Sequence, residues 1–353
     1  MRSVDKVNTT VEEKQYETSK RLFWALMAIG LVLLVSIVCL SLTCGNFQTS
    51  LSDVILAIIN SNDNPRVYRI ITLSRVPRLI AALFVGAALS VAGLVYQDIF
   101  LNRMASPDLL GVSAGAGCGA SFAIIMGLGF SMIGMMSFLG GIIAVALTIV
   151  VSNLFGRTNK SIALILSGIV IAGLMNSLLG LFKYVSSDTQ LATITFWLLG
   201  GFNAITYKQL TLVIPIVSVG LVMLYLFRWK ILMLRNGDLD AKMHGINAIA
   251  LRYVVILVST IITALSVCIS GTIGWIGLAI PNLMRIFVSN DSKRLMPLTI
   301  VYGMVFTATC DLLARTLTKS EIPVGIISGA LGACLFVIVL IVRRVQDGKS
   351  NGH

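Results

Sequence analysis

The sequence has 353 residues, of which 57% are hydrophobic and 12% are charged, and its mean hydropathy is +0.93. Soluble domains carry roughly 25% charged residues, and a soluble chain this apolar would expose very large apolar patches. The composition therefore excludes a soluble enzyme, a nucleic-acid-binding protein and a disordered scaffold. It predicts an all-α, polytopic membrane protein.

The net charge of the chain is +12. We assign the excess to cytoplasmic loops, where Lys and Arg accumulate in membrane proteins, and we expect no nucleic-acid partner. The six cysteines lie almost entirely in apolar runs without a CxxC pair, and the chain has two histidines. The sequence therefore predicts neither a disulfide framework nor a metal site, and no cofactor is expected in this chain.

Long intervals without charge mark the membrane spans, because a helix needs about 20 apolar residues to cross a bilayer. We predict a flexible cytoplasmic tail at 1–21, a transmembrane domain at 22–342 and a cytoplasmic tail at 343–353. A short or partly re-entrant element is expected at 189–207. The ten expected crossings are 22–43, 76–97, 107–127, 132–155, 161–184, 208–228, 251–270, 272–287, 295–314 and 325–342.

The distribution of positive charge predicts the orientation. Ten crossings put both termini on one side, and a cytoplasmic placement leaves 19 Lys and Arg residues inside and 8 outside, as the positive-inside rule requires. The longest outer segment is then 44–75. Its apolar residues recur at helical spacing and predict an amphipathic helix on the outer surface; they are Leu51, Val54, Ile55, Ile58 and Ile59.

Glycines mark turns and close contacts between spans. The interval 109–156 must hold two helices that turn near Gly127–Ser131, and the interval 253–284 holds one full helix to about Ser270 and a shorter piece interrupted by Pro281. Gly111, Gly115 and Gly119 are spaced four apart, a pattern that lets helix backbones approach closely. The tetrapeptide at 88–91 recurs at 264–267, which hints at an inverted repeat.

Three cytoplasmic connections are candidates for function. The turns at 98–110 and 155–161 are either ordinary loops or a cytoplasmic gate, whose residues would be Asn102, Arg103, Met104, Thr158 and Asn159. In the longer loop at 229–250, Asn236 or Asp238 can cap a short helix through Ala241–His244, which Gly245 would end in a left-handed conformation. This helix is either a docking surface for a soluble partner or part of a plain amphipathic loop.

Other function classes find little support. Charged residues deep in spans would indicate a proton or ion relay, but Asp98, Asp311 and Arg315 fall near predicted helix ends, so an ion-coupled carrier is the weaker interpretation. The chain has no phosphate-binding loop of the spacing that ATPases need. It also has no arrangement of Ser, His and Asp or of paired carboxylates that would indicate an enzyme.

Seven stretches, in order along the chain, resemble the permease family of the iron–siderophore and cobalamin ABC importers, known as the FecCD type. Two stretches depart from the family pattern: Asn282 stands where His is usual, and Arg103-Met104-Ala105 stands where Pro-Leu-Ala is usual. The matching stretches are Arg75-Val76-Pro77-Arg78 with 85–89, Asn102 through Gly115, 197–201, 240–245, 271–282, 311–315 and 321–325.

The resemblance implies the type II ABC importer permease fold and a place in the cytoplasmic (inner) membrane. It implies a transport subunit for a metal chelate, with a ferric siderophore first and haem, cobalamin or an oxyanion as alternatives. The implied partners are a second permease subunit (identical or not), an extracytoplasmic binding protein and two ATPase subunits that bind ATP and Mg²⁺. The chain itself would hydrolyse no ATP.

The resemblance also implies roles for particular residues. Arg75, Arg78 and Arg315 would reach the outer membrane boundary, where their guanidinium groups would extend into water and receive acidic side chains of the binding protein. The pathway between the two permeases would be wide and free of buried charge. The residues implied to couple the subunit to the ATPase are Asp238, Asp240, Ala241, Lys242, His244 and Gly245.

Overall fold

The computed structural model describes residues 2–350 except 46, 48, 51, 53, 55, 57–64, 156–159 and 289–291, and every regular element in these residues is helical. Eight helices are long and apolar enough to cross a membrane, and two shorter apolar helices accompany them. The prediction of an all-α membrane protein is confirmed. The two shorter helices, α5 and α12, occupy the crossings expected at 107–127 and 272–287.

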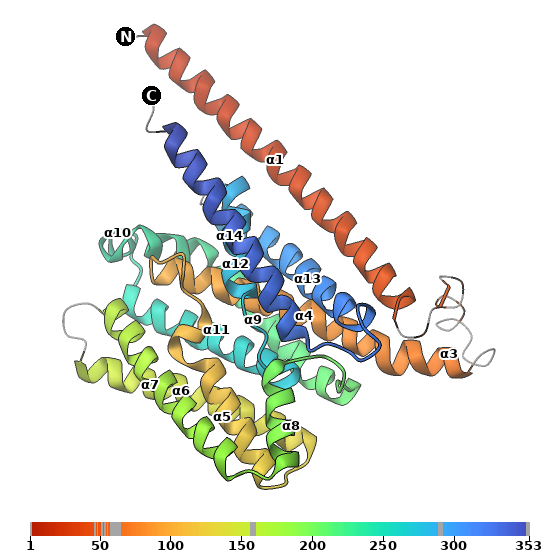
Figure 1. Ribbon diagram of the computed structural model, residues 1–353. Helices are drawn as coiled ribbons and strands as arrows, with labels where there is room; N and C mark the ends of the chain where they lie inside the picture. The colour runs from red at the N-terminus through yellow and green to blue at the C-terminus, as the bar shows by residue number, and fades with distance from the viewer. Residues whose placement is uncertain are drawn as a thin grey trace.

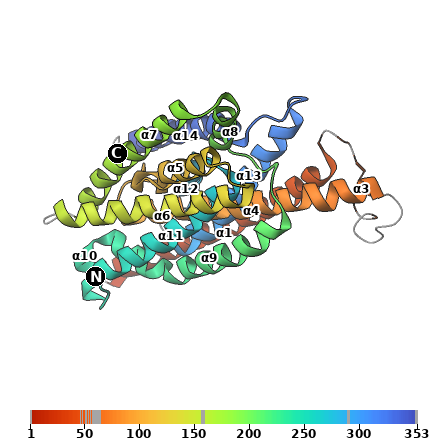
Figure 2. The ribbon, with the colours of Figure 1, turned by 90° about the horizontal axis from the view of Figure 1, so that it is seen from below.

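The helices form two packing groups, one centred on α4 and one made of α5, α6 and α7 (Figures 1 and 2). α4 packs against α9, α11, α12 and α13, whereas α5, α6 and α7 pack mainly on one another. The helices are α1 (Arg2–Thr43), α3 (Pro65–Arg69), η1 (Ile70–Arg75), α4 (Val76–Ile99), η2 (Pro107–Leu110), α5 (Val112–Ile125), α6 (Phe130–Phe155), α7 (Lys160–Val185), α8 (Asp188–Leu199), α9 (Tyr207–Asn236), α10 (Asp238–Met243), α11 (Ala248–Ser270), α12 (Ile276–Phe287), α13 (Ser292–Thr316) and α14 (Val324–Ser350).

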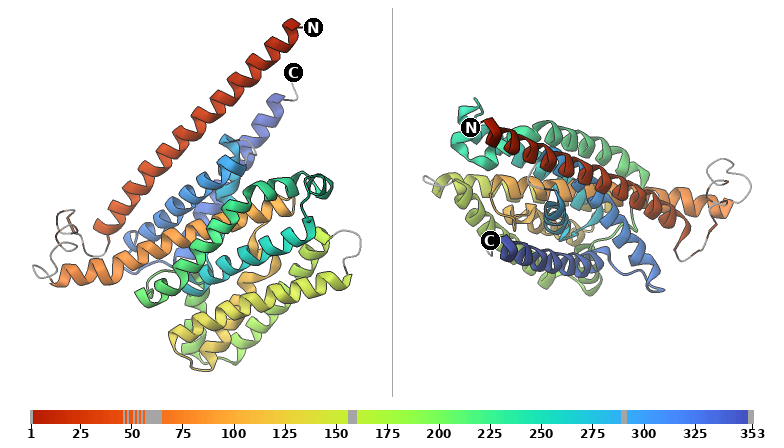
Figure 3. Two further views of the ribbon diagram at one scale, coloured as in Figure 1. Left: turned by 180° about the vertical axis from the view of Figure 1, so that it is seen from behind. Right: turned by 90° about the horizontal axis from the view of Figure 1, so that it is seen from above.

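The position of α4 decides where the core lies. In the most apolar window of the span Pro65–Ile99, 83% of residues are buried, against 11% in the span Lys20–Thr43 of α1. α1 accordingly lies along the outside of the bundle (Figure 3). Because α4 is Ala- and Gly-rich, its neighbours approach its backbone closely: a Cβ atom at Gly93 would lie 1.9 Å from the carbonyl oxygen of Gly277.

Several local predictions are confirmed. The turn after α5 uses Gly127 at φ +67°, and α11 ends at Ser270 as expected. Cβ atoms at Gly115 and Gly119 would collide with backbone atoms of α6, which confirms the close α5–α6 packing. The repeated tetrapeptides lie on α4 and α11, which pack together.

Other boundaries differ from the predictions. The N-terminal tail expected to be flexible is the first part of α1, and α9 continues past residue 228 to Asn236. The crossing expected to begin at 76 begins at Pro65. It passes Pro77 through the π-helical segment η1, where the Val76 N–H donates to the carbonyl of Ile71. Such a bulge accommodates a proline, which lacks an N–H group and crowds the preceding turn.

Most of the amphipathic helix predicted within 44–75 lies outside the described residues. Of its apolar positions, Val54 is described and is buried with Val67 and Ile71. This contact places the segment against the first turns of the α3–η1 helix.

Candidate functional site

The two ends of the bundle carry different polar features. α10, the start of α1, the last turns of α14 and the adjoining ends of α6 and α7 lie towards one end, and α3 and the connection from α13 to α14 lie towards the other (Figures 1 and 3). The first end corresponds to the predicted cytoplasmic side.

α10 is a short helix set between two glycines. Gly237 at φ +122° precedes it and Gly245 at φ +70° follows it, so the left-handed stop expected at Gly245 is confirmed. Asn247 caps the next helix, because its side chain accepts a hydrogen bond from the Ala250 N–H at 3.1 Å. The cap expected from Asn236 or Asp238 is wrong: Gly237 occupies the N-cap position, without a side-chain cap.

The residues of α10 divide into a buried and an exposed set. Ala241 is fully buried within the chain, so its expected contact with a partner stays a prediction that its burial disfavours. Lys242 and His244 are exposed and Asp240 is half-buried; the side chain of Asp238 is outside the described set. Leu239 is 78% exposed and Met243 is 81% exposed; the sequence reasoning missed these two apolar residues although their i, i+4 spacing was a signal.

The turn that follows α4 is exposed and strained. Leu101 has φ +52°, a conformation that is costly for a non-glycine residue and often marks a functional position. Asn102, Arg103 and Met104 are exposed, and the Asn102 side chain accepts a hydrogen bond from the Met104 N–H at 2.9 Å. The other two predicted gate residues, Thr158 and Asn159, lie outside the described residues.

An ion-pair cluster joins three helices beside this turn. The Asp98 carboxylate, 3% exposed, lies 2.7 Å from an Arg285 nitrogen and 3.9 Å from an Arg235 nitrogen. A second buried cluster lies at the opposite end of α4. Buried charge is therefore present, contrary to the expectation, and Asp98 and Asp311 are each paired with at least one arginine from another helix.

The second cluster contains the predicted docking residues. Arg78 binds Asp311 at 2.6 Å and Glu321 at 2.7 Å, and Arg315 lies 3.4 Å from Asp311. Arg75 donates hydrogen bonds to the Thr49 hydroxyl and to the carbonyl of Thr43. Each of the three arginines is at most 7% exposed.

The outer surface position expected for these arginines is therefore wrong. The guanidinium groups are turned into the protein because carboxylates and carbonyls of α1, α13 and neighbouring loops bind them there. Charge reversal at Arg78 is consequently expected to destabilise the permease itself. Such a variant therefore cannot test contact with the binding protein separately from folding. Contact of the three arginines with a binding protein stays a prediction that their burial disfavours.

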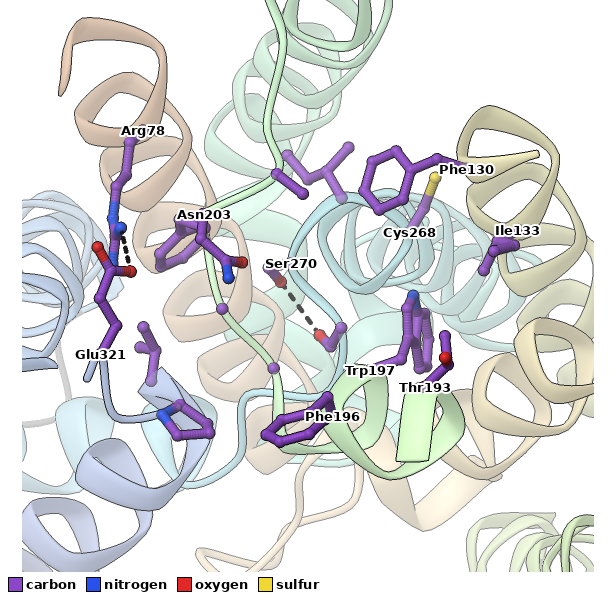
Figure 4. Close-up of a pocket in the computed structure, with 18 of the residues that line it drawn as sticks. Arg78, Phe130, Ile133, Thr193, Phe196, Trp197, Asn203, Cys268, Ser270 and Glu321 are labelled. Atoms are coloured by element: carbon purple, nitrogen blue, oxygen red, sulfur yellow. Dashed lines mark hydrogen bonds and ion pairs between the residues drawn. The ribbon is translucent and has the colours of Figure 1, made fainter. Parts of the chain in front are cut away.

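A cavity of about 470 Å³ opens beside this second cluster, the one that contains Arg78 and Glu321. Figure 4 shows the Arg78–Glu321 pair on one wall and Trp197, Phe196 and Thr193 of α8 on the other. The irregular segments 200–204 and 321–323 and residues of α5, α6 and α11 also line the cavity. The irregular segments are tied together, because the Val324 N–H donates to the Gly200 carbonyl and the Gly201 N–H to that of Ser270. The sequence reasoning placed a short or partly re-entrant element at 189–207 but did not anticipate the cavity.

Comparisons with known proteins agree with this arrangement. The model of the FecCD transport family matches residues 32–343. The chain is 36% identical over 270 residues to a Helicobacter pylori protein named "Probable iron chelatin transport system permease protein", covering 76% of this chain and 82% of that one. It is 34% identical to the molybdate import system permease protein MolB of Haemophilus influenzae, covering 82% and 85%.

Two further similarities extend over more of the chain. The hemin transport system permease protein HmuU of Yersinia pestis is 32% identical, covering 89% of this chain and 95% of that one. A solved structure of a metal-chelate type ABC transporter in an inward-facing conformation superposes with a TM-score of 0.81 at 30% identity, covering 91% and 99% of the two chains. The chain belongs to the FecCD transport family.

Proposed function

We propose that the chain is the membrane-spanning permease subunit of an ATP-driven importer for a metal chelate, with a ferric siderophore as the first candidate. The observation that carries the proposal is α10, a glycine-bounded helix whose two exposed apolar side chains project from one end of a membrane bundle. The match to the family over residues 32–343 and the permease names of the relatives support it.

The proposed machine has parts that this chain does not supply. Two permease subunits, identical or not, would enclose the pathway, two ATPase subunits would bind ATP and Mg²⁺, and an extracytoplasmic binding protein would deliver the chelate. ATP-driven closure of the ATPase pair would push on α10 and open the pathway alternately to either side. An ion-coupled carrier is disfavoured, because the buried charges of both described clusters are held in ion pairs at the ends of α4.

The names of the relatives indicate different substrates, so the substrate of this chain has to be measured. Their names include iron chelatin, hemin and molybdate. Uptake of radiolabelled iron as ferric siderophores, of haem and of molybdate should be compared in cells with and without the gene. Loss of ferric siderophore uptake on deletion, restored by the parent gene, is expected; loss of only molybdate or haem uptake would reassign the cargo within the family.

The exposed apolar residues of α10 provide a test of coupling. Met243→Asp and Leu239→Asp should abolish co-purification of the ATPase with the permease, because each places a charge in an apolar contact that excludes water. The amount of folded permease should not change, since both side chains are more than three-quarters exposed. Lys230→Asp on the exposed surface of α9 is the matched control. If both α10 variants retain the ATPase, this helix is not the docking surface.

The proposed orientation places both termini in the cytoplasm. Ser320, in the exposed connection before α14, should then be outside and His244 inside. A membrane-impermeant maleimide applied to intact cells should label Ser320→Cys and leave His244→Cys at the level of the parent, whose own cysteines set the background. The reverse pattern would invert the topology.

A further inference from the structure

The cluster around Asp98 connects α10 to the cytoplasmic turn through a short series of contacts. Arg235 is the penultimate residue of α9, and only Gly237 separates α9 from α10. Arg235 therefore lies three residues before the start of α10. The Arg235 side chain, 23% exposed, points its Nε towards the Asp98 carboxylate at 3.9 Å.

Asp98 holds a second arginine much more tightly. The Arg285 Nη2 lies 2.7 Å from the same carboxylate oxygen, Oδ1, and both side chains are 3% exposed. This ion pair has a short distance and is buried from water, so it holds the end of α4 against α12. Charge-assisted hydrogen bonds strengthen when water is excluded. The longer Arg235 contact lies at the limit of an ion pair and can lengthen or shorten without breaking the first.

α12 in turn holds the turn that contains the predicted gate residues. Asn282, one helical turn before Arg285, is fully buried, and its side-chain nitrogen donates to the carbonyl of Arg103 at 2.8 Å. α12 thus binds the chain on both sides of Leu101: Arg285 contacts Asp98 before it, and Asn282 contacts Arg103 after it. Asn102 and Met104, which flank Arg103, are exposed at this end of the bundle.

We propose that Asp98 is the positioning residue through which movement of α10 reaches the cytoplasmic turn. Two arginines share one carboxylate oxygen, so a shift of Arg235 changes how strongly Asp98 holds Arg285. The change passes to α12 and, through Asn282, to the backbone of the turn. The proposal rests on the proposed function, in which α10 receives the ATPase.

Arg235→Gln separates this role from a purely structural one. The substitution removes the adjustable contact and leaves the tight Asp98–Arg285 pair in place. In proteoliposomes that contain the permease with its ATPase and binding protein, we expect the amount of complex and the basal ATP hydrolysis to match the parent. Chelate imported per ATP hydrolysed should fall roughly 5- to 10-fold, the lower range of measured coupling between sites.

A second readout follows the turn directly. Met104, 54% exposed, can be replaced by Cys in a background without other accessible cysteines, and its rate of modification by a maleimide measured with and without ATP. The rate should change with ATP in the parent complex and stay constant in the Arg235→Gln complex. Lys230→Gln, which removes a charge from the same helix away from Asp98, should behave as the parent.

Asp98→Asn and Asp98→Glu complete the series. Asp98→Asn should lose coupling at least as completely as Arg235→Gln, and Asp98→Glu should recover part of it. If Asp98→Asn does not fold, the Arg235→Gln result still decides.

The proposal would be overturned if the Arg235→Gln complex imports as much chelate per ATP as the parent and if the modification rate of its Met104→Cys thiol changes with ATP as in the parent. Loss of the ATPase from the Arg235→Gln complex would also overturn it, because Arg235 would then belong to the docking surface. Failure of the proposed function looks different: Met243→Asp would retain the ATPase, or no ATPase would bind the parent.

Discussion

Replacing Asp311 with asparagine is expected to lower the free energy of unfolding of the permease by about 3–5 kcal/mol, the usual cost of removing one partner from a buried ion pair. Asp311 is 1% exposed and serves both Arg78 and Arg315. Without its charge, two buried guanidinium groups would depend on Glu321 and on carbonyl oxygens. The helices α4, α13 and α1 meet at this point, so the loss should loosen all three.

The measurement can use a reporter that the chain already contains. Cys310 is fully buried beside Asp311. In a background in which the other five cysteines are replaced, its reaction with a thiol-reactive dye during heating of the detergent-purified protein reports unfolding around the cluster. The midpoint should fall by several degrees in Asp311→Asn.

Glu321→Gln is the matched control, because the Glu321 side chain is 35% exposed and solvent-accessible ion pairs contribute about 1 kcal/mol or less. A double variant, Asp311→Asn with Arg315→Gln, should recover part of the loss by removing one of the stranded charges. Equal midpoints for Asp311→Asn and the parent would show that the cluster does not hold the fold together.

Gly93→Val is expected to be the most damaging single change on α4, costing on the order of 3 kcal/mol or more. A Cβ atom at Gly93 would lie 1.9 Å from the carbonyl oxygen and 2.4 Å from the carbonyl carbon of Gly277. These are backbone atoms of the segment that begins α12, so no side-chain rotation relieves the overlap. α4 and α12 would have to separate, which would also disturb the Asp98–Arg285 pair.

The control for this change is Gly173→Val on α7. A Cβ atom at Gly173 would meet nothing within 4 Å. Both glycines lie inside helices, so the helix propensity of valine affects the two variants alike, and their difference isolates packing. Membrane yield and size-exclusion profiles of fluorescently tagged protein should show loss of the monodisperse peak for Gly93→Val alone. Similar profiles for both variants would contradict the close α4–α12 contact.

The sequence by itself determined the features that depend on local chemistry. Charge-free intervals fixed the membrane class and most helices, because apolar length alone decides what can span a bilayer. The turns at Gly127 and Gly245 could be predicted because glycine adopts left-handed backbone angles without a steric penalty. The cap at Asn247 and the end of α11 at Ser270 were predictable for similar reasons of backbone hydrogen bonding.

Tertiary structure alone decided how the charges are satisfied. Arg78 is 233 residues from Asp311, and Arg285 is 187 residues from Asp98. An arginine near the end of a span can either extend to water or pair inside the bundle, and both fit the same local sequence. Packing of α4 between α12 and α13 brings these partners together and buries them. The same packing buries Ala241 and exposes Met243, because the neighbours of α10, rather than its own sequence, determine which of its sides faces solvent.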